Sequence, residues 1–254
     1  MKVSVITTVL NGADTLPDAF ESLWAQDYPD IEHVVIDGGS TDGTVEFVNA
    51  HRDRVGYFSS EPDNGLYDAF NKGIQAASGD LVGFLHADDL FASPTIISEL
   101  VSALQTHKAT MVYGDLNYVD RTNPDRIIRH WRSGAFSRRR LGWGWMPPHP
   151  TLFVDRLHFL EVGLFDTSYR IAGDYDHMLR LLLHEGTRPA YLEKVVTLMR
   201  VGGVSNRSLN NLRRKSSEDY RIIKRQLGGG AFTLLAKNLR KVPQFLTPYV
   251  SRKH

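Results

Sequence analysis

The stretch Gly79-Asp-Leu-Val-Gly-Phe-Leu-His-Ala-Asp-Asp-Leu90 joins a short apolar run to two adjacent carboxylates, and the fold can be worked out from it. Residues 81–85 are apolar and follow a Gly-Asp turn signal, which predicts a buried strand. In an open α/β sheet, ligands bind beyond the carboxyl ends of the strands. Asp88 and Asp89 would stand there, where paired carboxylates suit a hard divalent cation such as Mg2+ or Mn2+ carrying a phosphorylated ligand. The same pair could instead form a solvated turn that caps the helix expected from Pro94.

The chain before this strand alternates between apolar strands and amphipathic helices. Strands are predicted at 3–9, 31–36 and 55–59, with helices at about 16–28, 45–51 and 66–77. This alternation predicts an α/β fold with a mostly parallel central sheet flanked by helices, a Rossmann-like nucleotide-binding half. It is not a nicotinamide domain, because the Gly-x-Gly-x-x-Gly turn is missing after the first strand, and the P-loop pattern is missing as well.

Beyond residue 90 the alternation is looser. Residues 94–105 predict a helix, and 110–113 a strand that ends at Gly114-Asp115. Residues 121–144 are polar, basic and aromatic, and predict a long or flexible loop. The remaining expectations are a strand at 151–154, a helix at 156–162, a helix from 173 to about 185 and a strand at 189–200.

Composition limits the classes of function. The chain has 254 residues, is 42% hydrophobic and 23% charged, and carries a formal net charge of +1. Cysteine is absent, which excludes disulfides, a thiolate nucleophile and Cys-ligated metals. The N-terminal apolar run is too short for a signal peptide, and no stretch reaches the ~18 apolar residues of a membrane span. We therefore expect a cytoplasmic protein with no nucleic-acid partner.

The ordered set of motifs resembles the family 2 glycosyltransferases, which have the GT-A fold. The resemblance covers roughly residues 3 to 205. It rests on Val3-Ser-Val-Ile-Thr-Thr-Val-Leu-Asn11, Asp37-Gly-Gly-Ser-Thr-Asp-Gly-Thr44, Glu61-Pro-Asp-Asn-Gly-Leu-Tyr-Asp-Ala-Phe-Asn-Lys-Gly73, Phe84-Leu-His-Ala-Asp-Asp89, His149-Pro-Thr-Leu-Phe-Val-Asp-Arg156 and Gly173-Asp-Tyr-Asp-His-Met-Leu-Arg180.

The resemblance implies transfer of a sugar from a nucleotide-diphosphate donor, a UDP-sugar or GDP-sugar, with inversion at the anomeric carbon. By position, Thr8 and Asp37 are expected to contact the nucleotide. Asp88 is expected beside the ribose, and Asp89 on a Mn2+ or Mg2+ ion at the diphosphate. Asp174 aligns with the catalytic base, although a carboxylate there could also cap a helix.

Some residues depart from the family pattern. Gly38 replaces the second Asp of the common Asp-Asp-Gly-Ser motif, so one base-contacting carboxylate is lost and looser discrimination among nucleotides is expected. His86 replaces the first Asp of the Asp-x-Asp-Asp pattern. A late His ligand for the metal is not evident near Arg200.

Four further residues are possible ligand contacts. His149, Lys72 and Trp145 are candidates for contact with the acceptor or the diphosphate, and Arg156 for contact with phosphates. The sequence is equally compatible with a structural role for His149. It is also compatible with a solvated surface position for Lys72 and Arg156.

The resulting interpretation is a single-addition enzyme that glycosylates a hydroxyl of a glycan or lipid-linked acceptor in surface polysaccharide or glycolipid biosynthesis. The Gln-x-x-Arg-Trp signature of processive synthases is absent. Two alternatives stay open: a nucleotidyltransferase that activates a sugar phosphate, and a nucleotide- or carbohydrate-binding module without turnover.

The last 48 residues differ from the rest, which suggests a catalytic domain at 1–206 and a basic helical extension at 207–254. The extension has twelve Lys and Arg residues against Glu218 and Asp219. Its apolar series is broken by Pro243 and Pro248, so it could lie in a bilayer interface without crossing. It would then hold the protein on the anionic inner face of the cytoplasmic membrane. The alternative is a helix packed on the catalytic domain or on a second subunit of a homo-oligomer.

Overall fold

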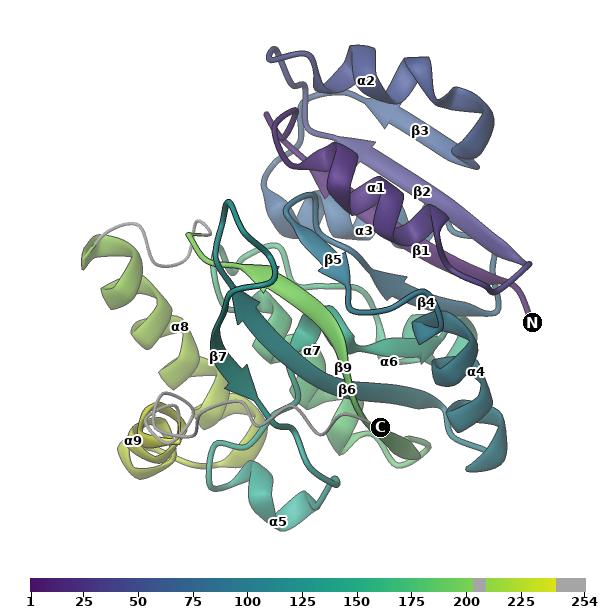
Figure 1. Cartoon of the computed structure of the whole chain (residues 1–254). Helices are drawn as coiled ribbons and strands as arrows, with labels where there is room; N and C mark the ends of the chain where they lie inside the picture. The colour runs from purple at the N-terminus through teal and green to yellow at the C-terminus, as the bar shows by residue number, and fades with distance from the viewer. Residues whose placement is uncertain (203–208, 241–254) are drawn as a thin grey trace.

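The computed structural model describes residues 1–202 and 209–240 and confirms the expected α/β architecture. Within these residues one curled sheet contains nine strands, flanked by helices (Figure 1). The strand order is β3-β2-β1-β4-β8-β6-β9-β5, and β7 pairs with β6 outside this path. None of the described helices is long and apolar enough to cross a membrane.

Four strands form the parallel first half of the sheet. They are β1 (Val3–Val9), β2 (Ile31–Asp37), β3 (Tyr57–Ser60) and β4 (Leu81–Phe84). The helices that connect them are α1 (Leu16–Trp24), α2 (Thr44–Ala50) with the short 3-10 turn η1 (Arg52–Arg54), and α3 (Leu66–Ala76). Because the strands are parallel, their carboxyl ends and the loops after them lie at one edge.

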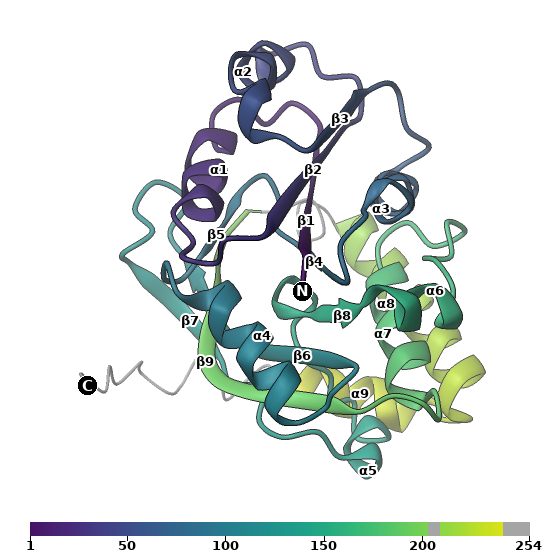
Figure 2. The ribbon, with the colours of Figure 1, turned by 90° about the vertical axis from the view of Figure 1, so that its right-hand side faces the viewer.

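Helices cover both faces of this half-sheet, with α1 and α2 on one side and α3 on the other (Figure 2). Side chains of a strand alternate between the two faces. Accordingly, Ile6 and Ile36 are buried with α3, while Val35 is buried with α1. The near-continuous apolar runs of β1 and β2 follow from this burial on both faces.

The second half of the sheet is mixed. Its strands are β5 (Asp89–Phe91), β6 (Met111–Val119), β7 (Ile127–Trp131), β8 (Phe153–Asp155) and β9 (Pro189–Arg200). Strand β8 runs antiparallel to both β4 and β6, β6 runs parallel to β9, and β5 runs antiparallel to β9. Helix α4 (Ile96–Thr106) covers the α1 side of this region.

A close approach of two backbones joins the halves. Gly83 of β4 pairs with Phe153 of β8, and a Cβ at Gly83 would lie 2.2 Å from the phenyl ring. The ring of Phe153 is completely buried. Glycine is therefore required at this position because a side chain would collide with the ring.

Two expectations for the middle of the chain were wrong. Residues 121–144 are not one long loop, because they contain β7 and α5 (Arg138–Leu141). Strand β6 does not end at Asp115 but continues to Val119, with a register shift against β9 around Asp115. The register shift places the buried carboxylate of Asp115 inside the strand. In the sequence, Gly114-Asp115 has the pattern of a strand end.

The remaining elements pack on the α3 side. They are η2 (His149–Thr151), α6 (Arg156–Val162), α7 (Gly173–Leu183), α8 (Leu209–Leu227) and α9 (Ala231–Leu239). Ile222 and Ile223 of α8 are fully buried in the same core cluster as α7. Lys237 of α9 forms a buried ion pair with Asp219 at 2.7 Å and lies over the ring of Tyr175.

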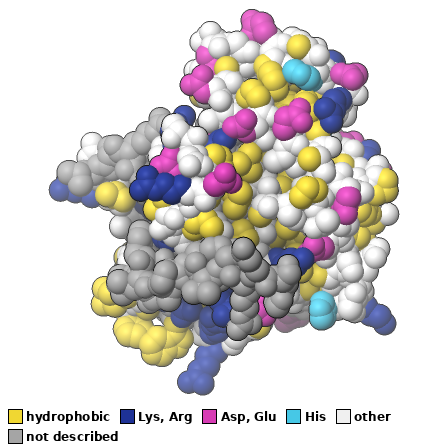
Figure 3. Space-filling view, in the orientation of Figure 1, with side chains coloured by type: hydrophobic (Ala, Val, Ile, Leu, Met, Phe, Trp, Pro, Cys, Tyr) yellow, Lys and Arg dark blue, Asp and Glu magenta, His cyan; other side chains and the backbone are white. Residues whose placement is uncertain are grey.

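The described part of the basic extension thus packs on the catalytic body, in agreement with one of the two alternatives from the sequence. Pro243, Pro248 and the rest of 241–254 lie outside the described residues, so their expected contact with a membrane stays a prediction. The face in Figure 3 has acidic and basic side chains scattered over it, which agrees with the formal net charge of +1.

Candidate active site

The candidate site lies at the carboxyl edge of the parallel half-sheet, where β1, β2 and β4 end. Thr8 stands one residue before the end of β1, and its hydroxyl oxygen is buried without a hydrogen-bond partner in the described part of the chain. A buried hydroxyl left unpaired costs free energy unless a ligand or water pairs with it. This position is consistent with the contact to the nucleotide that the sequence predicts for Thr8.

Asp37 ends β2 and organises the loop that follows. Its carboxylate is completely buried and accepts hydrogen bonds from the backbone amides of Gly39 and Ser40, each at 3.0 Å. It also accepts from the hydroxyls of Ser40 and Ser60. These partners all lie within the protein, so contact between Asp37 and a nucleotide stays a prediction, while its effect on loop shape is direct.

Asp63 is a residue whose role sequence reasoning missed. One of its carboxylate oxygens lies 2.6 Å from the point that a Cβ on Gly38 would occupy. The other oxygen accepts a hydrogen bond from the amide of Gly65 at 2.9 Å. The carboxylate that Gly38 lacks is thus replaced in space by one from the loop after β3.

Asp89 has the environment of a cation ligand. It is 1% exposed, and neither carboxylate oxygen has a hydrogen-bond partner among the described residues. Burial, with the neighbouring charge of Asp88, raises the pKa of Asp89 well above its usual range, and Arg200 opposes this. An ionised carboxylate buried without a partner is costly, and a bound divalent cation would remove that cost. Asp89 and Asp88 therefore fit a metal of the hard, oxygen-binding kind.

Arg200, at the end of β9, is a second residue that the sequence did not single out as a contact. It is buried, and one terminal nitrogen pairs with Asp18. Its Nε and its other terminal nitrogen are buried and have no hydrogen-bond partner within residues 1–202 and 209–240. A guanidinium with free donors beside an acidic pair is suited to phosphate oxygens.

Asp174 lies in the first turn of α7, which begins at Gly173. It is half-buried, and its carboxylate accepts a hydrogen bond from the amide of Tyr175 at 2.8 Å and a long one from the Tyr67 hydroxyl at 3.5 Å. The residue at the cap is Ala172, so Asp174 is not the capping residue.

The structure brings Asp174 to the Asp-Asp edge. His86 lies within electrostatic reach of both Asp88 and Asp174, although burial has the larger effect and lowers the pKa of His86. Burial also raises the pKa of Tyr118. The positive charge of Arg129 lowers this pKa, and the negative charges of Asp89 and Asp174 raise it. Carboxylates some 85 positions apart in the sequence thus act on the same two side chains.

Asp176, the next residue considered for the base, points elsewhere. It is 1% exposed, pairs with Arg180 at 2.9 Å and accepts a hydrogen bond from Gln226 at 3.1 Å. The ion pair lies within α7, and the hydrogen bond from Gln226 joins α7 to α8. Asp174 is therefore the better placed of the two carboxylates to receive a proton.

The other suggested contacts have mainly structural surroundings. His149 stacks on Phe70 and His86, and burial together with His86 lowers the pKa of His149 to about 3, so the ring is neutral. Trp145 is 3% exposed and donates its indole N–H to the carbonyl of Ser133. Contact of these two rings with acceptor or diphosphate is not supported by this packing.

The two basic candidates are also occupied. Lys72 forms ion pairs with Glu61 at 2.9 Å and Asp68 at 3.7 Å. Arg156 donates to the carbonyl of Ala77, and its neighbour Asp155 pairs with Leu81 at the start of β4. Arg156 therefore lies at the edge of the sheet opposite the site, and the expected phosphate contact was wrong.

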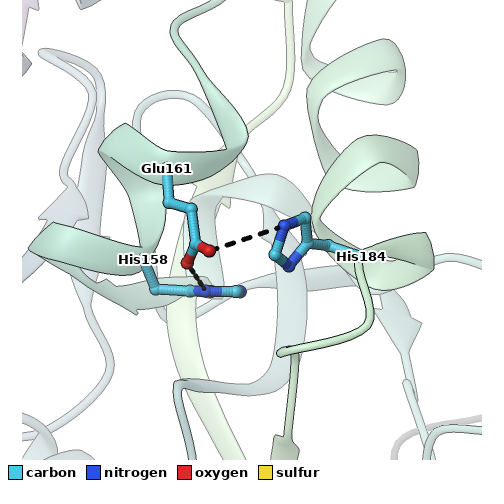
Figure 4. A group of neighbouring side chains, drawn as sticks. All are labelled: His158, Glu161 and His184. Atoms are coloured by element: carbon cyan, nitrogen blue, oxygen red, sulfur yellow. Dashed lines mark hydrogen bonds and ion pairs between the residues drawn. The ribbon is translucent and has the colours of Figure 1, made fainter.

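Another polar cluster lies away from this site, at the far end of α7. The side chains of His158, Glu161 and His184 face one another, with 3.3 Å between His158 Nδ1 and Glu161 Oε2 (Figure 4). The ligand atoms of this group are close enough to share a metal ion. Because Asp174 stands at the other end of the helix, the cluster is not part of the candidate active site.

The comparisons define the class of protein. Residues 4–162 match the model of glycosyl transferase family 2. An uncharacterized glycosyltransferase of Mycobacterium tuberculosis is 37% identical over 186 residues, covering 71% of this chain and 69% of the relative. A PGL/p-HBAD biosynthesis glycosyltransferase of Mycobacterium bovis is 31% identical over 208 residues, covering 80% and 78%. The chain belongs to glycosyl transferase family 2.

Solved structures agree with this assignment at the level of the fold. Residues 1–349 of S. aureus TarS in complex with UDP-GlcNAc align with a TM-score of 0.69 at 17% identity, over 97% of this chain and 72% of that chain. The mannosyltransferase PcManGT from Pyrobaculum calidifontis, in complex with GDP-Man and Mn2+, aligns with a TM-score of 0.65 at 20% identity, over 96% and 73%. The fold is thus GT-A type, and the protein is a glycosyltransferase rather than a nucleotidyltransferase or a binding module.

Proposed function

We propose that this glycosyltransferase moves a single sugar from a UDP-sugar or GDP-sugar to an acceptor hydroxyl, with inversion at the anomeric carbon. The observation that carries the proposal is the buried, unpartnered carboxylate of Asp89 at the same edge as Thr8 and Asp174. The complexes of TarS with UDP-GlcNAc and of PcManGT with GDP-Man support a nucleotide-sugar donor.

The donor diphosphate is assigned to the space beside Asp88 and Asp89. Asp89 would hold the Mn2+ or Mg2+ ion, and Asp88 would lie beside the ribose. Arg200 would donate to phosphate oxygens from the two nitrogens that have no partner among the described residues. The ion, when bound, supplies positive charge against the negative charge that develops on the leaving nucleoside diphosphate. Thr8 would donate or accept a hydrogen bond at the nucleotide.

Asp174 is assigned as the general base. It accepts the proton of the acceptor hydroxyl while that oxygen bonds to the anomeric carbon, and the bond from this carbon to the donor diphosphate breaks on the opposite face. The configuration therefore inverts in one displacement. The amide of Tyr175 and the hydroxyl of Tyr67 orient the carboxylate, because both donate to the same oxygen.

We further assign the acceptor to glycans or lipid-linked molecules of surface polysaccharide or glycolipid biosynthesis, at the inner face of the cytoplasmic membrane. The similarity to a PGL/p-HBAD biosynthesis glycosyltransferase supports this assignment. Residues 241–254 contribute further Lys and Arg residues to the basic extension, which would favour an anionic surface.

The base is tested by Asp174→Asn, which keeps the size of the side chain and removes the proton acceptor. Transfer should fall by ~10^2 to 10^4-fold, the usual contribution of general-base catalysis, with donor affinity nearly unchanged. The matched control is Asp176→Asn, whose carboxylate pairs inside the protein. Near-normal transfer by Asp174→Asn would assign the base to another group.

A further inference from the structure

A basic hollow lies next to the loop that leads into α7. It encloses about 500 Å3 between residues 168–170 and helix α8. Its lining includes Ser168, Arg170, Arg213, Arg214, Ser217 and Arg221. Two serines and four arginines thus line one hollow, and the family motifs quoted from the sequence do not include these positions.

The single carboxylate of the lining does not neutralise these arginines. Glu218 is 3% exposed, and its oxygens accept hydrogen bonds from the backbone amides of Arg170, Ile171 and Ala172 at 2.9 to 3.1 Å. Its acceptor capacity is therefore used in holding the loop. With four arginines and one carboxylate the lining carries an excess of positive charge.

The four arginines differ from other basic residues of α8 and α9. Arg225 pairs with Asp166 at 3.6 Å, and Lys237 pairs with Asp219 at 2.7 Å. Among the residues that the structure describes, no carboxylate forms an ion pair with Arg170, Arg213, Arg214 or Arg221. Gathering like charges is unfavourable unless an anion joins them, and guanidiniums bind phosphate oxygens with well-matched geometry.

The hollow and the proposed base share one loop. The hydroxyl of Tyr67 donates to the carbonyl of Ile171 at 2.7 Å and also approaches Asp174 at 3.5 Å. Arg170 and Asp174 are four positions apart, and even an extended chain of that length spans at most about 14 Å. A molecule that presents its hydroxyl to Asp174 can therefore place another of its groups in the hollow.

We propose that this hollow binds a phosphate or diphosphate group of the acceptor. The inference rests on the proposed function, because it assigns the anion to the molecule whose hydroxyl Asp174 deprotonates. The acceptor class is then narrowed to phosphate-bearing glycans or lipids. The membrane headgroup offers the same phosphate chemistry from a different source, and the experiment separates the two.

The test uses the full chain and inorganic pyrophosphate, titrated calorimetrically in EDTA so that no metal supports binding at the donor site. The variant is Arg213→Gln/Arg214→Gln, and the control is Arg138→Gln/Arg139→Gln, another exposed adjacent pair that removes the same charge. We expect the Arg213→Gln/Arg214→Gln protein to bind pyrophosphate at least about tenfold more weakly than wild type, because charge-assisted hydrogen bonds are lost. The control pair should bind pyrophosphate as wild type does. Arg170→Gln should weaken binding in the same direction.

Two further measurements make each result decisive. Binding of UDP or GDP with Mn2+ should be unchanged in every variant, and the absence of both from the wild-type protein would refute the proposed function rather than the hollow. Equal pyrophosphate binding by wild type and pocket variants would overturn the proposal. So would a pocket variant that loses binding to vesicles of phosphatidylglycerol and phosphatidylcholine together with pyrophosphate, because a membrane headgroup would then be the source of the phosphate.

Discussion

The replacement of the missing carboxylate at Gly38 by Asp63 makes a strong prediction about nucleotide recognition. The resemblance to the family places a base-contacting carboxylate at residue 38, and Asp63 Oδ2 lies 2.6 Å from the position of that residue's absent Cβ. A carboxylate accepts hydrogen bonds from the ring N–H groups of uracil or guanine. The sequence alone predicts looser discrimination among bases, whereas the position of Asp63 predicts discrimination through its carboxylate.

The perturbation is Asp63→Ala, measured by calorimetric titration with UDP and GDP in the presence of Mn2+. A hydrogen bond to a charged group contributes about 1.5–3 kcal/mol, so the preferred nucleotide should bind roughly 10- to 150-fold more weakly. The affinity for the nucleotide that wild type disfavours should change less. The ratio of the affinities for UDP and GDP should therefore move closer to one. Asp53→Ala, which removes an exposed Asp from the same half of the protein, should change neither affinity.

A second variant tests the spatial argument itself. Gly38→Asp alone should weaken binding, because its side chain meets the Asp63 carboxylate at 2.6 Å. In the Asp63→Ala background the same change should restore much of the lost affinity, since Gly38 does not have a positive φ and tolerates a side chain once the space is free. Unchanged nucleotide binding in Asp63→Ala would refute the reasoning, and so would a double variant weaker than Asp63→Ala.

Two predictions concern stability. Burial lowers the pKa of His33 to about 3, so between pH 6.5 and 3 the unfolded chain binds more protons and stability falls as the pH falls. Between pH 7 and 5 the protonation of His33 in the unfolded chain should lower the free energy of unfolding of wild type by about 2 kcal/mol. In urea unfolding, the free energy of His33→Gln should fall less than that of wild type over the same pH range, by this amount. Equal decreases in both proteins would contradict the assignment. Gly83→Ala should cost about 3 kcal/mol through collision with the buried ring of Phe153, whereas Gly142→Ala, whose Cβ would meet only an ordinary contact at 3.7 Å, should be close to neutral in thermal unfolding. A Gly83→Ala protein as stable as wild type would show that the two strands can separate freely.

The sequence predicted the regular parts of the fold well because their patterns are local. The apolar runs of β1 and β9 and the helix at 156–162 appear at the expected residues. The hairpin strand β7 was missed because it is only partly buried and its sequence, Ile127-Ile-Arg-His-Trp131, does not alternate apolar and polar residues. Its stability comes from pairing with β6, which a local pattern does not record.

The site divides in the same way. Asp88, Asp89 and Asp174 could be named from motifs because each lies at the end of a recognisable element. Asp63 and Arg200 could not be assigned, because their roles depend on long-range contacts, with Gly38 across two loops in one case and with Asp89 across the β5–β9 pairing in the other. The opposite error, Arg156, arose because phosphate contact was inferred from charge without knowledge of the sheet edge.

The claim that Asp89 holds a cation on the donor diphosphate is tested most directly by thermal unfolding with UDP, in Mn2+ and in EDTA. A ligand that binds the folded state raises its stability by RT ln(1 + [L]/Kd), so the account predicts a larger shift with Mn2+ than with EDTA for wild type. Asp89→Asn, which keeps the shape of the buried side chain, should lose this extra shift while still folding. An extra shift with Mn2+ that persists at full size in Asp89→Asn would contradict the account.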